Sequence, residues 1–326
     1  MNIQRRLLIA AACLVAAGLS NAQSGPYPSR PLRMIVPFAP GGASDFVARI
    51  IQPKISEVMG QQVVIDNRAG ASGNIGVELA ARSPADGYTM LLGNVGTMAV
   101  NPAIFPKFPV NPVADLTGIS LLVDVPGAFA VHPSVAAKSV PEFIQYAKSR
   151  PGQLNYGSSG AGSAQRLAFE FLMSKAGIKL THVPYKGGAG AATAAVLAGE
   201  VCCTMVTVAS FIPHVKSGKA RVLAVMAPQR VAQLPDTPTM SESGFPELTL
   251  GSWQGMYVPK GTPRAVVTQL YAVLMKTMHD PDVMKRLQQG GAEIVTSKSP
   301  DEFAGFMKAQ NAFWAKIVKD VGAMAE

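Results

Sequence analysis

The sequence is poor in cysteine, histidine and charged residues. Of its 326 residues, 3 are cysteine, 4 are histidine and 15% are charged, a low charged fraction that argues against intrinsic disorder. Neither a CxxC nor an HExxH motif occurs, and the histidines do not have the spacing of metal ligands; they are His132, His182, His214 and His279. We therefore expect no metal site and no cofactor.

Disulfides and nucleic-acid contacts also lack support in the sequence. The two cysteines outside the N-terminal leader, Cys202 and Cys203, are adjacent. A disulfide between neighbouring residues is strained, and on a strand the two side chains would point to opposite faces. We expect no structural disulfide. No basic run with interleaved aromatic residues is present, so we expect no nucleic-acid partner.

Long apolar runs are missing as well. Leu7–Leu19 covers 13 residues, whereas a transmembrane helix needs about 20. Arg5 and Arg6 precede this run and Ser20-Asn21-Ala22 follows it, which is the pattern of a secretory signal peptide. We predict a signal peptide at residues 1–22, cleavage near Ala22 and a periplasmic mature chain. Its removal lowers the formal net charge from +9 to +7, which suits either anionic ligands or simply solubility.

A strand, a glycine-rich turn and an amphipathic helix follow one another near the start of the mature chain. The apolar run Met34–Val36 leads through Pro37–Pro40 into Gly41-Gly42-Ala43-Ser44-Asp45, and a helical pattern comes next. Such a turn directs free backbone N–H groups and the positive helix end at one spot, which suits a carboxylate or a phosphate. The alternative is a tight turn that needs glycine only for its backbone angles.

A second turn of the same kind occurs far along the chain. Leu154–Tyr156 precedes the glycine- and serine-rich stretch Gly157–Ser163, and a helical pattern covers Ala164–Ala176. The stretch is not a phosphate loop, because the required lysine is missing. Two anion-type turns in one chain indicate two lobes that close on one small ligand, as in a binding protein.

Strand and helix patterns alternate, which predicts an α/β fold with largely parallel sheets. Ligands of such sheets bind beyond the carboxyl ends of strands, so the loop Gly93–Thr97, with Asn94, is a further candidate. We predict lobe 1 at residues 23–124 plus 252–326 and lobe 2 at residues 125–251.

Proline positions mark several predicted boundaries. Two strand-like segments, Ile119–Val125 and Phe129–Val131, are separated by Pro126-Gly127. Three helices are predicted to begin with a capping residue followed by proline at the first helical position, and these pairs are Thr262-Pro263, Asp280-Pro281 and Ser299-Pro300.

Ordered motifs over nearly all of Tyr27–Glu326 resemble the substrate-binding proteins of tripartite tricarboxylate transporters, the Bug receptors. They are Ile35–Asp45, Gly60-Gln61, Asn67-Arg68, Ala85–Thr89, Pro151–Gly160, His182–Gly187, Leu234–Thr239 and Gly261–Pro263. The resemblance implies a two-lobed periplasmic binding protein of type II, each lobe a mostly parallel sheet flanked by helices. It further implies a receptor, not an enzyme, that captures a small organic carboxylate between the lobes and delivers it to membrane permease subunits. We expect a monomer.

The resemblance also implies which residues contact the ligand. One jaw consists of Phe38, Ala39, Gly41, Gly42, Ala43 and Asp45, and the other of Ser158, Ser159, Gly160, Gly162, Ser163 and Ala164. Tyr185, Lys186 and Gly187 belong to a family motif near the cleft, where the alternative role is turn structure.

Two positions depart from the family pattern. Arg166 stands where the family often has histidine, and it is either a clamp for a second carboxylate or a solvated helix residue. The clamp would favour a dicarboxylate over a monocarboxylate. Cys202 stands where the family often has aspartate, and it is either a changed cleft residue or a small buried hydrophobe.

Two other functions stay open at this stage. The same fold serves equally as a ligand-sensing module for a membrane sensor kinase, which the sequence does not distinguish from transport. An enzyme on this fold would use Asp45 as a general base, although an N-terminal helix cap is the more ordinary role for this residue.

Overall fold

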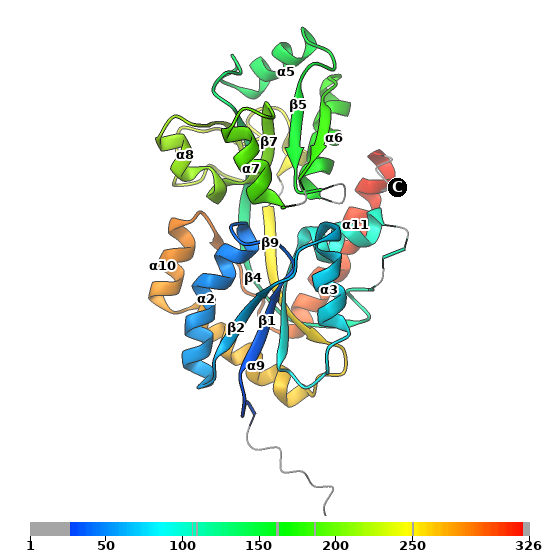
Figure 1. Cartoon of the computed structure of the whole chain (residues 1–326), viewed down its shortest axis with the longest axis vertical. Coiled ribbons are helices and arrows are strands. Elements are labelled where there is room, and N and C mark those ends of the chain that lie inside the picture. The colour runs from blue at the N-terminus through cyan, green and yellow to red at the C-terminus, as the bar shows by residue number, and fades with distance from the viewer. Residues whose placement is uncertain are drawn as a thin grey trace, which may run out of the picture.

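The computed structural model describes residues 27–321 apart from residues 106, 109, 161, 162, 186 and 250. The chain forms two α/β lobes that are joined by long strands running from one lobe into the other (Figure 1). The predicted signal peptide, residues 1–22, lies outside the described residues. None of the helices in the described part combines the length and the hydropathy needed to cross a membrane.

The strands of the described chain form one continuous 10-stranded sheet. Its order is β2-β1-β3-β9-β4-β7-β5-β6, and β8 and β10 pair with β4 as well. β1 is parallel to β2 and β3, and β5 is parallel to β6 and β7, whereas β4 and β9 run antiparallel to their neighbours. The strands are β1 (Leu32–Val36), β2 (Val63–Asn67), β3 (Thr89–Asn94), β4 (Leu116–Val131), β5 (Asn155–Ser158), β6 (Thr181–Pro184), β7 (Cys203–Thr207), β8 (Arg221–Met226), β9 (Gly251–Pro259) and β10 (Glu293–Ile294).

Helices cover both faces of the sheet in each lobe. They are α2 (Ala43–Met59), α3 (Asn74–Ala81), α4 (Asn101–Ile104), α5 (Val140–Lys148), α6 (Ala164–Ala176), α7 (Ala189–Leu197), α8 (Ile212–Lys216), α9 (Arg264–Met278), α10 (Pro281–Gln289) and α11 (Pro300–Val321). Short turns of 3-10 or π helix occur at Ala71–Gly73, Gly96–Val100, Val208–Ser210 and Pro246–Leu248.

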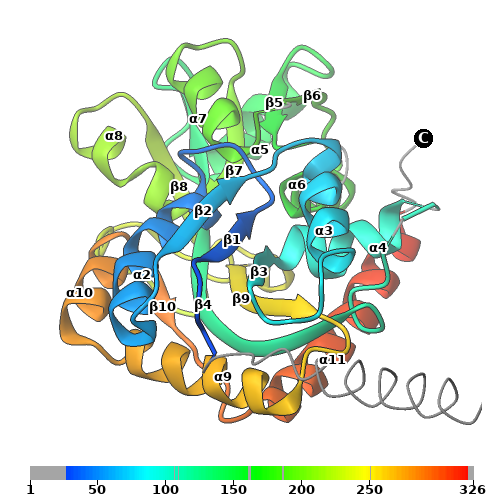
Figure 2. The same cartoon turned by 60° about the horizontal axis from the view of Figure 1, so that its bottom comes forward.

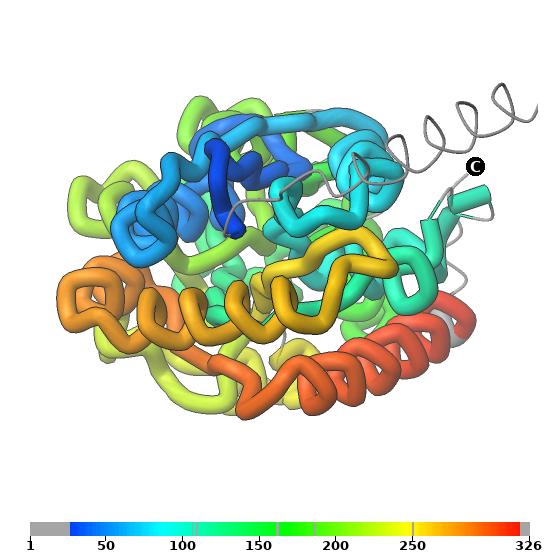
Figure 3. Tube along the Cα trace, turned by 90° about the horizontal axis from the view of Figure 1, so that it is seen from below, coloured from blue at the N-terminus to red at the C-terminus, as the bar shows by residue number. Residues whose placement is uncertain are grey.

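In the first lobe, α2, α9 and α10 pack on one face of the sheet and α3, α4 and α11 on the other (Figure 2). Met34 and Val36 of β1 belong to the first of these cores, and Ile35 belongs to the second. Successive side chains of a strand point to opposite faces, so a strand buried on both sides has to be apolar at every position. Figure 3 shows the C-terminal helices lying against the part of the lobe that is built from the start of the chain.

The second lobe has the same layered plan around β5, β6, β7, β8 and the end of β4. Residues of α5 and α6 form a core on one face, with Phe129, Phe143 and Phe169 in edge contacts. Residues of α7 and of the segment before α8 form a smaller core on the other face.

One continuous strand joins the lobes where the sequence predicted two. β4 pairs with β9 as far as Pro126, opposite Gly251, and from Gly127 onward it pairs with β7 and β8. The prediction of a break at Pro126-Gly127 was wrong. Proline removes one backbone donor, and the strand tolerates this loss because Pro126 lies where β4 changes partners.

The predicted helix starts are confirmed at two of the three proline pairs. Asp280 accepts hydrogen bonds from the N–H groups of Asp282 and Val283, and Ser299 accepts one from Glu302. The third prediction was wrong, because α9 begins after Pro263, which itself occupies the cap position. The Thr262 hydroxyl instead donates to the carbonyl of Pro259.

Candidate functional site

A cleft lies between the lobes at the carboxyl ends of β1, β5 and β7, and it has two contiguous chambers. The first we call the helix chamber, and its own lining residues are Ala39, Gly42, Ala43, Ser44, Gly187 and Ala189. The second we call the methionine chamber, and its own lining residues are Ser72, Val95, Gly96, Gly127, Ser163, Ala164, Met205, Val206, Met226 and Gly251. The chambers share Phe38, Asn94, Ser159, Gln165, Thr207 and Ser252.

The N-termini of three helices meet at this cleft. The first turns of α2 and α7 line the helix chamber, and neither helix has a side-chain cap on its N–H groups. The first turn of α6 lines the methionine chamber, and its cap residue Ser163 accepts a hydrogen bond from the N–H of Arg166. Uncapped N–H groups and the positive helix ends make this cleft electrostatically suited to an anion.

The turn between β1 and α2 is held in place by the carboxylate of Asp45. This carboxylate accepts hydrogen bonds from Gly41 N–H at 3.0 Å, Arg49 Nε at 2.8 Å and Asn67 Nδ2 at 3.1 Å. Asn67 also donates to the carbonyl of Phe38. Burial raises the pKa of Asp45, but the hydrogen bonds from Arg49, Gly41 and Asn67 outweigh it and keep the pKa below its usual range. Asp45 therefore remains ionised, and its hydrogen bonds hold the turn in its conformation.

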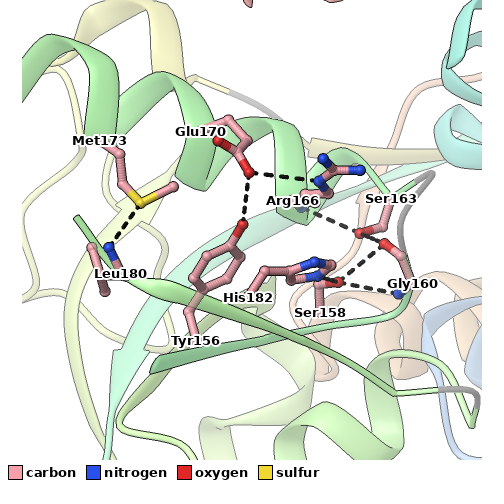
Figure 4. A network of polar contacts seen from close by, with 9 residues as sticks. All are labelled: Tyr156, Ser158, Gly160, Ser163, Arg166, Glu170, Met173, Leu180 and His182. Atoms are coloured by element: carbon pink, nitrogen blue, oxygen red, sulfur yellow. Dashed lines mark hydrogen bonds and ion pairs between the residues drawn. The ribbon is translucent and has the colours of Figure 1, made fainter. Parts of the chain in front are cut away.

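The second turn is organised by Ser158 at the end of β5 (Figure 4). The Ser158 hydroxyl lies 2.6 Å from Nε2 of His182, accepts from Gly160 N–H and donates to the carbonyl of Gly160. The Ser163 hydroxyl donates to the same carbonyl at 2.8 Å. Burial and the nearby charge of Arg166 lower the pKa of His182 to about 4, so the imidazole is neutral at neutral pH.

The lining of both chambers is neutral. None of the described lining residues is Asp, Glu, Lys, Arg or His. Several polar side chains are fixed by neighbours: Thr207 pairs with Ser210, and Ser252 accepts from Gln254. Asn94 accepts from Thr97 N–H, and its amide donates to Ser44. No group of three or more His, Cys, Asp or Glu residues in the described chain is arranged to hold a metal ion.

The structure brings together part of the predicted site. The predicted residues that line the chambers are Phe38, Ala39, Gly42, Ala43, Asn94, Ser159, Ser163, Ala164 and Gly187. Those that support the turns without lining either chamber are Gly41, Asp45, Ser158, Gly160, Arg166 and Tyr185. Gly162 and Lys186 lie outside the described residues.

Arg166 is turned toward its own helix. Its guanidinium lies 3.6 Å from the Glu170 carboxylate, and its side chain is 21% exposed, so it is not the solvated residue of the alternative interpretation either. Glu170 also accepts from the Tyr156 hydroxyl. The role of Arg166 as a clamp for a second carboxylate stays a prediction, and the position of its side chain beside Glu170 does not favour that role.

Cys202 and Tyr185 also lie away from the cleft. Cys202 precedes β7, and the cleft lies beyond the opposite end of that strand. Both thiols are free, and their sulfur atoms are 3.4 Å apart, so the expectation that they point to opposite faces was wrong. β7 begins only at Cys203, so Cys202 is not part of the strand, and the two side chains do not have to point to opposite faces of the sheet. The Tyr185 hydroxyl contacts Glu200 at 3.3 Å.

Sequence reasoning missed the parts of the lining that only the topology brings to the cleft. These residues are Ser72, Gly127, Gln165, Ala189, Met205, Val206, Thr207, Met226, Gly251 and Ser252, whereas Ser44, Val95 and Gly96 belong to turns that the sequence had already indicated. The glycines before α7 carried a usable signal, because Gly187-Gly188 followed by a helical pattern repeats the logic of the first two turns.

The two lobes, the strands that cross between them and the cleft define a periplasmic binding protein. The family model described as "Tripartite tricarboxylate transporter family receptor" matches residues 47–323, and the chain belongs to this family. It is 33% identical to protein BugT of Bordetella pertussis over 325 residues, which cover 99% of each chain. The assignment to the Bug receptors is thereby confirmed, and these are receptors rather than enzymes.

Two solved structures of high similarity were determined with ligands. Rpa4515 of R. palustris with adipate has a TM-score of 0.87 and 34% identity, and the match covers 91% of this chain and 99% of that chain. MatC of Rhodopseudomonas palustris with bound malate has a TM-score of 0.85 and 30% identity, and the match covers 90% of this chain and 100% of that chain. The predicted type of fold is confirmed by these similarities.

Proposed function

We propose that this receptor captures a small organic carboxylate in the cleft and delivers it to the permease subunits of a tripartite tricarboxylate transporter. The observation that carries the proposal is the pair of uncapped N-termini, those of α2 and α7, that face one chamber. The malate and adipate ligands of the two similar structures support the same class of ligand.

The neutral lining agrees with recognition by backbone dipoles. A carboxylate placed against the first turns of α2 and α7 would accept from N–H groups that lack side-chain partners. Hydroxyl and amide groups of Ser159, Thr207 and Gln165 lie around both chambers and offer further donors. Binding without a counter-charge leaves no unpaired buried cation in the empty receptor, where it would be costly.

The direct test is native mass spectrometry of the mature protein from a periplasmic extract, followed by identification of the released small molecule. A stoichiometric organic acid is the expected result. The complementary test is calorimetric titration with a panel of mono-, di- and tricarboxylates. A receptor that binds no member of the panel, or that binds organic cations instead, would refute the proposal.

A charge placed at the start of α2 tests the same site. Ala43 lines the helix chamber at the first position of α2. In Ala43→Asp, the new carboxylate is stabilised by the helix end by about 0.3–1 kcal/mol, while it repels the ligand. We expect a stable protein with at least about tenfold weaker carboxylate binding, equivalent to about 1.4 kcal/mol.

The matched control is Ala43→Asn, which has the same shape without the charge. It should bind more tightly than the aspartate variant in the same titration. Equal affinities of the two variants would show that the helix chamber does not hold the anion.

We also propose that the receptor does not alter its ligand chemically, so that the bound acid is released intact. Asp45 is the acidic residue of the predicted jaws, and its oxygens are occupied by Gly41, Arg49 and Asn67. The test is incubation of the receptor with its ligand, followed by mass analysis. Recovery of a chemically altered acid would contradict this assignment.

The remaining assignments about the whole chain are proposals too. We propose export to the periplasm with cleavage near Ala22, a monomer, and the lobe division at residues 125 and 251. The change of partners of β4 between Pro126 and Gly127 supports this division. N-terminal sequencing and light scattering of periplasmic protein test the first two.

A further inference from the structure

We propose that the methionine chamber receives the body of the ligand and selects carboxylates with an extended hydrocarbon body over their polyhydroxylated analogues. This inference rests on the proposed function, because it assigns the carboxylate head to the helix chamber. It concerns the other chamber, whose lining has a different composition.

The wall of the methionine chamber comes from the ends of three strands of the second lobe. Gly127 of β4 is paired with Thr207 of β7 on one side and with Met226 of β8 on the other. Met205 and Val206 precede Thr207 on β7, and both line the chamber. Glycine at the middle of this wall leaves room, and the two methionines beside it are flexible and polarisable. They suit a hydrocarbon chain or ring of variable shape.

The apolar side chains of this wall offer no hydrogen-bond partner to a hydroxylated body. Met205, Val206 and Met226 are each less than 5% exposed and carry neither a side-chain donor nor a strong acceptor. On the opposite wall, Val95 is also apolar and is 3% exposed. A ligand hydroxyl placed between them would lose its water without a replacement partner, which is unfavourable.

The polar side chains around the chamber are in part committed to the protein. The Ser163 hydroxyl donates to the carbonyl of Gly160 and accepts from Arg166 N–H, and the Thr207 hydroxyl pairs with Ser210. Asn94 is held by Thr97 and Ser44. Asn94 and Thr207 line the region shared with the helix chamber, and Ser163 lies at the start of α6.

The experiment is a titration of the mature receptor with matched pairs of acids that differ in hydroxyl groups at equal carbon number. The pairs are adipate with galactarate, hexanoate with gluconate, and succinate with tartrate. In every pair that binds, we expect the unsubstituted acid to bind at least about tenfold more tightly, since an apolar pocket rejects an isostere with an added hydroxyl group by up to about a hundredfold.

Variants of the wall localise the effect. Met226→Gln should reduce the preference for the unsubstituted acid by about tenfold. Met240→Gln is the matched control, because Met240 is buried in the same core of the second lobe and lines neither chamber. It should lower stability similarly and leave the preference unchanged. Met205→Leu keeps the wall apolar and should retain the preference.

The outcomes separate this inference from the proposed function. Tighter binding of the hydroxylated member of a pair, or an unchanged preference in Met226→Gln, overturns the inference and leaves carboxylate capture intact. Failure of every carboxylate to bind overturns the proposed function and the inference with it.

Discussion

Asp124 is a partly buried carboxyl at the place where the lobes join. It lies on β4, two residues before the partner change, paired with Trp253 of β9 on one side and Glu293 of β10 on the other. Its Oδ1 atom is buried without a hydrogen-bond partner in the described part of the chain. Burial, together with the charge of Glu293, raises the pKa of Asp124 to about 6, although a hydrogen bond from Val125 N–H opposes this rise.

This shift predicts how stability depends on pH. The unfolded carboxyl has a pKa of about 3.9, so between about pH 4 and pH 6 the folded protein holds a proton that the unfolded chain has released. Stability should therefore fall as the pH rises through this window, by up to about 3 kcal/mol. Asp124→Asn should be more stable than the natural protein at pH 7, and the gain should vanish near pH 4.

Urea unfolding at several pH values measures this effect. Asp236→Asn, at an exposed position, is the control, and its stability should depend on pH in the same way as that of the natural protein. A gain for Asp124→Asn that is independent of pH would show that the carboxyl is not the cause.

Substituting two neighbouring glycines in the turn between β1 and α2 gives a second test at the residue scale. Gly41 has a φ of +92° and Gly42 a φ of −91°, and an added Cβ would meet no atom within 4 Å at either position. Gly41→Ala should cost about 1–3 kcal/mol from backbone strain alone, whereas Gly42→Ala should cost little. Thermal or urea unfolding of the ligand-free protein checks this, and equal costs would mean that the turn relaxes.

Individual helices differ in how their N-termini are used. α5 and α10 are capped by Ser139 and Asp280, and neither cap residue lines the cleft. α2 and α7 lack side-chain caps, and their first turns line the helix chamber. α6 is intermediate, since Ser163 caps it and also lines the methionine chamber.

A pair of serine substitutions separates capping from ligand binding. Ser163→Ala and Ser139→Ala each remove one cap hydrogen bond, to Arg166 N–H at 3.2 Å and to Glu142 N–H at 3.3 Å. Each should cost about 1 kcal/mol of stability. Ser163→Ala also removes one of the hydrogen bonds that hold the Gly160 carbonyl at the second turn, so its carboxylate affinity should fall roughly tenfold, by about 1.4 kcal/mol.

Parallel unfolding and titration experiments on both variants measure the two effects. Ser139→Ala should retain the affinity of the natural protein. Should both variants bind alike, Ser163 would act on the helix alone.

At the scale of the whole molecule, the lobes share structure that makes them interdependent. β4 belongs to the sheet of both lobes through its pairing with β9, β7 and β8. In addition, Leu167 of α6 packs in the same core as Trp314 and Val318 of α11, so the last helix bridges the lobes behind the cleft.

This sharing predicts cooperative unfolding. Neither lobe keeps its sheet if β4 is lost, so the free receptor should unfold in one calorimetric transition despite its size. A bound carboxylate at 100 times its dissociation constant should stabilise the whole protein by about 2.7 kcal/mol. Two separated transitions, or a ligand that shifts only part of one, would show that the lobes unfold independently.

Local structure was largely determined by the sequence. The apolar run Met34–Val36, the glycines after it and the capping residues at Asp280 and Ser299 predicted elements that the structure contains. These signals work because backbone angles, missing donors and cap hydrogen bonds depend on residues only a few positions apart. The family motifs added the two-lobed fold and the first two turns of the cleft.

Only the tertiary structure decided which groups share the cleft. The start of α7, the methionines of β7 and β8 and Ser252 of β9 meet there because strands distant in sequence end at the same place. The same topology makes β4 continuous through Pro126, since new partners for the strand become available there. Side-chain direction and long-range pairing depend on packing between distant segments, for which a sequence pattern carries no local signal.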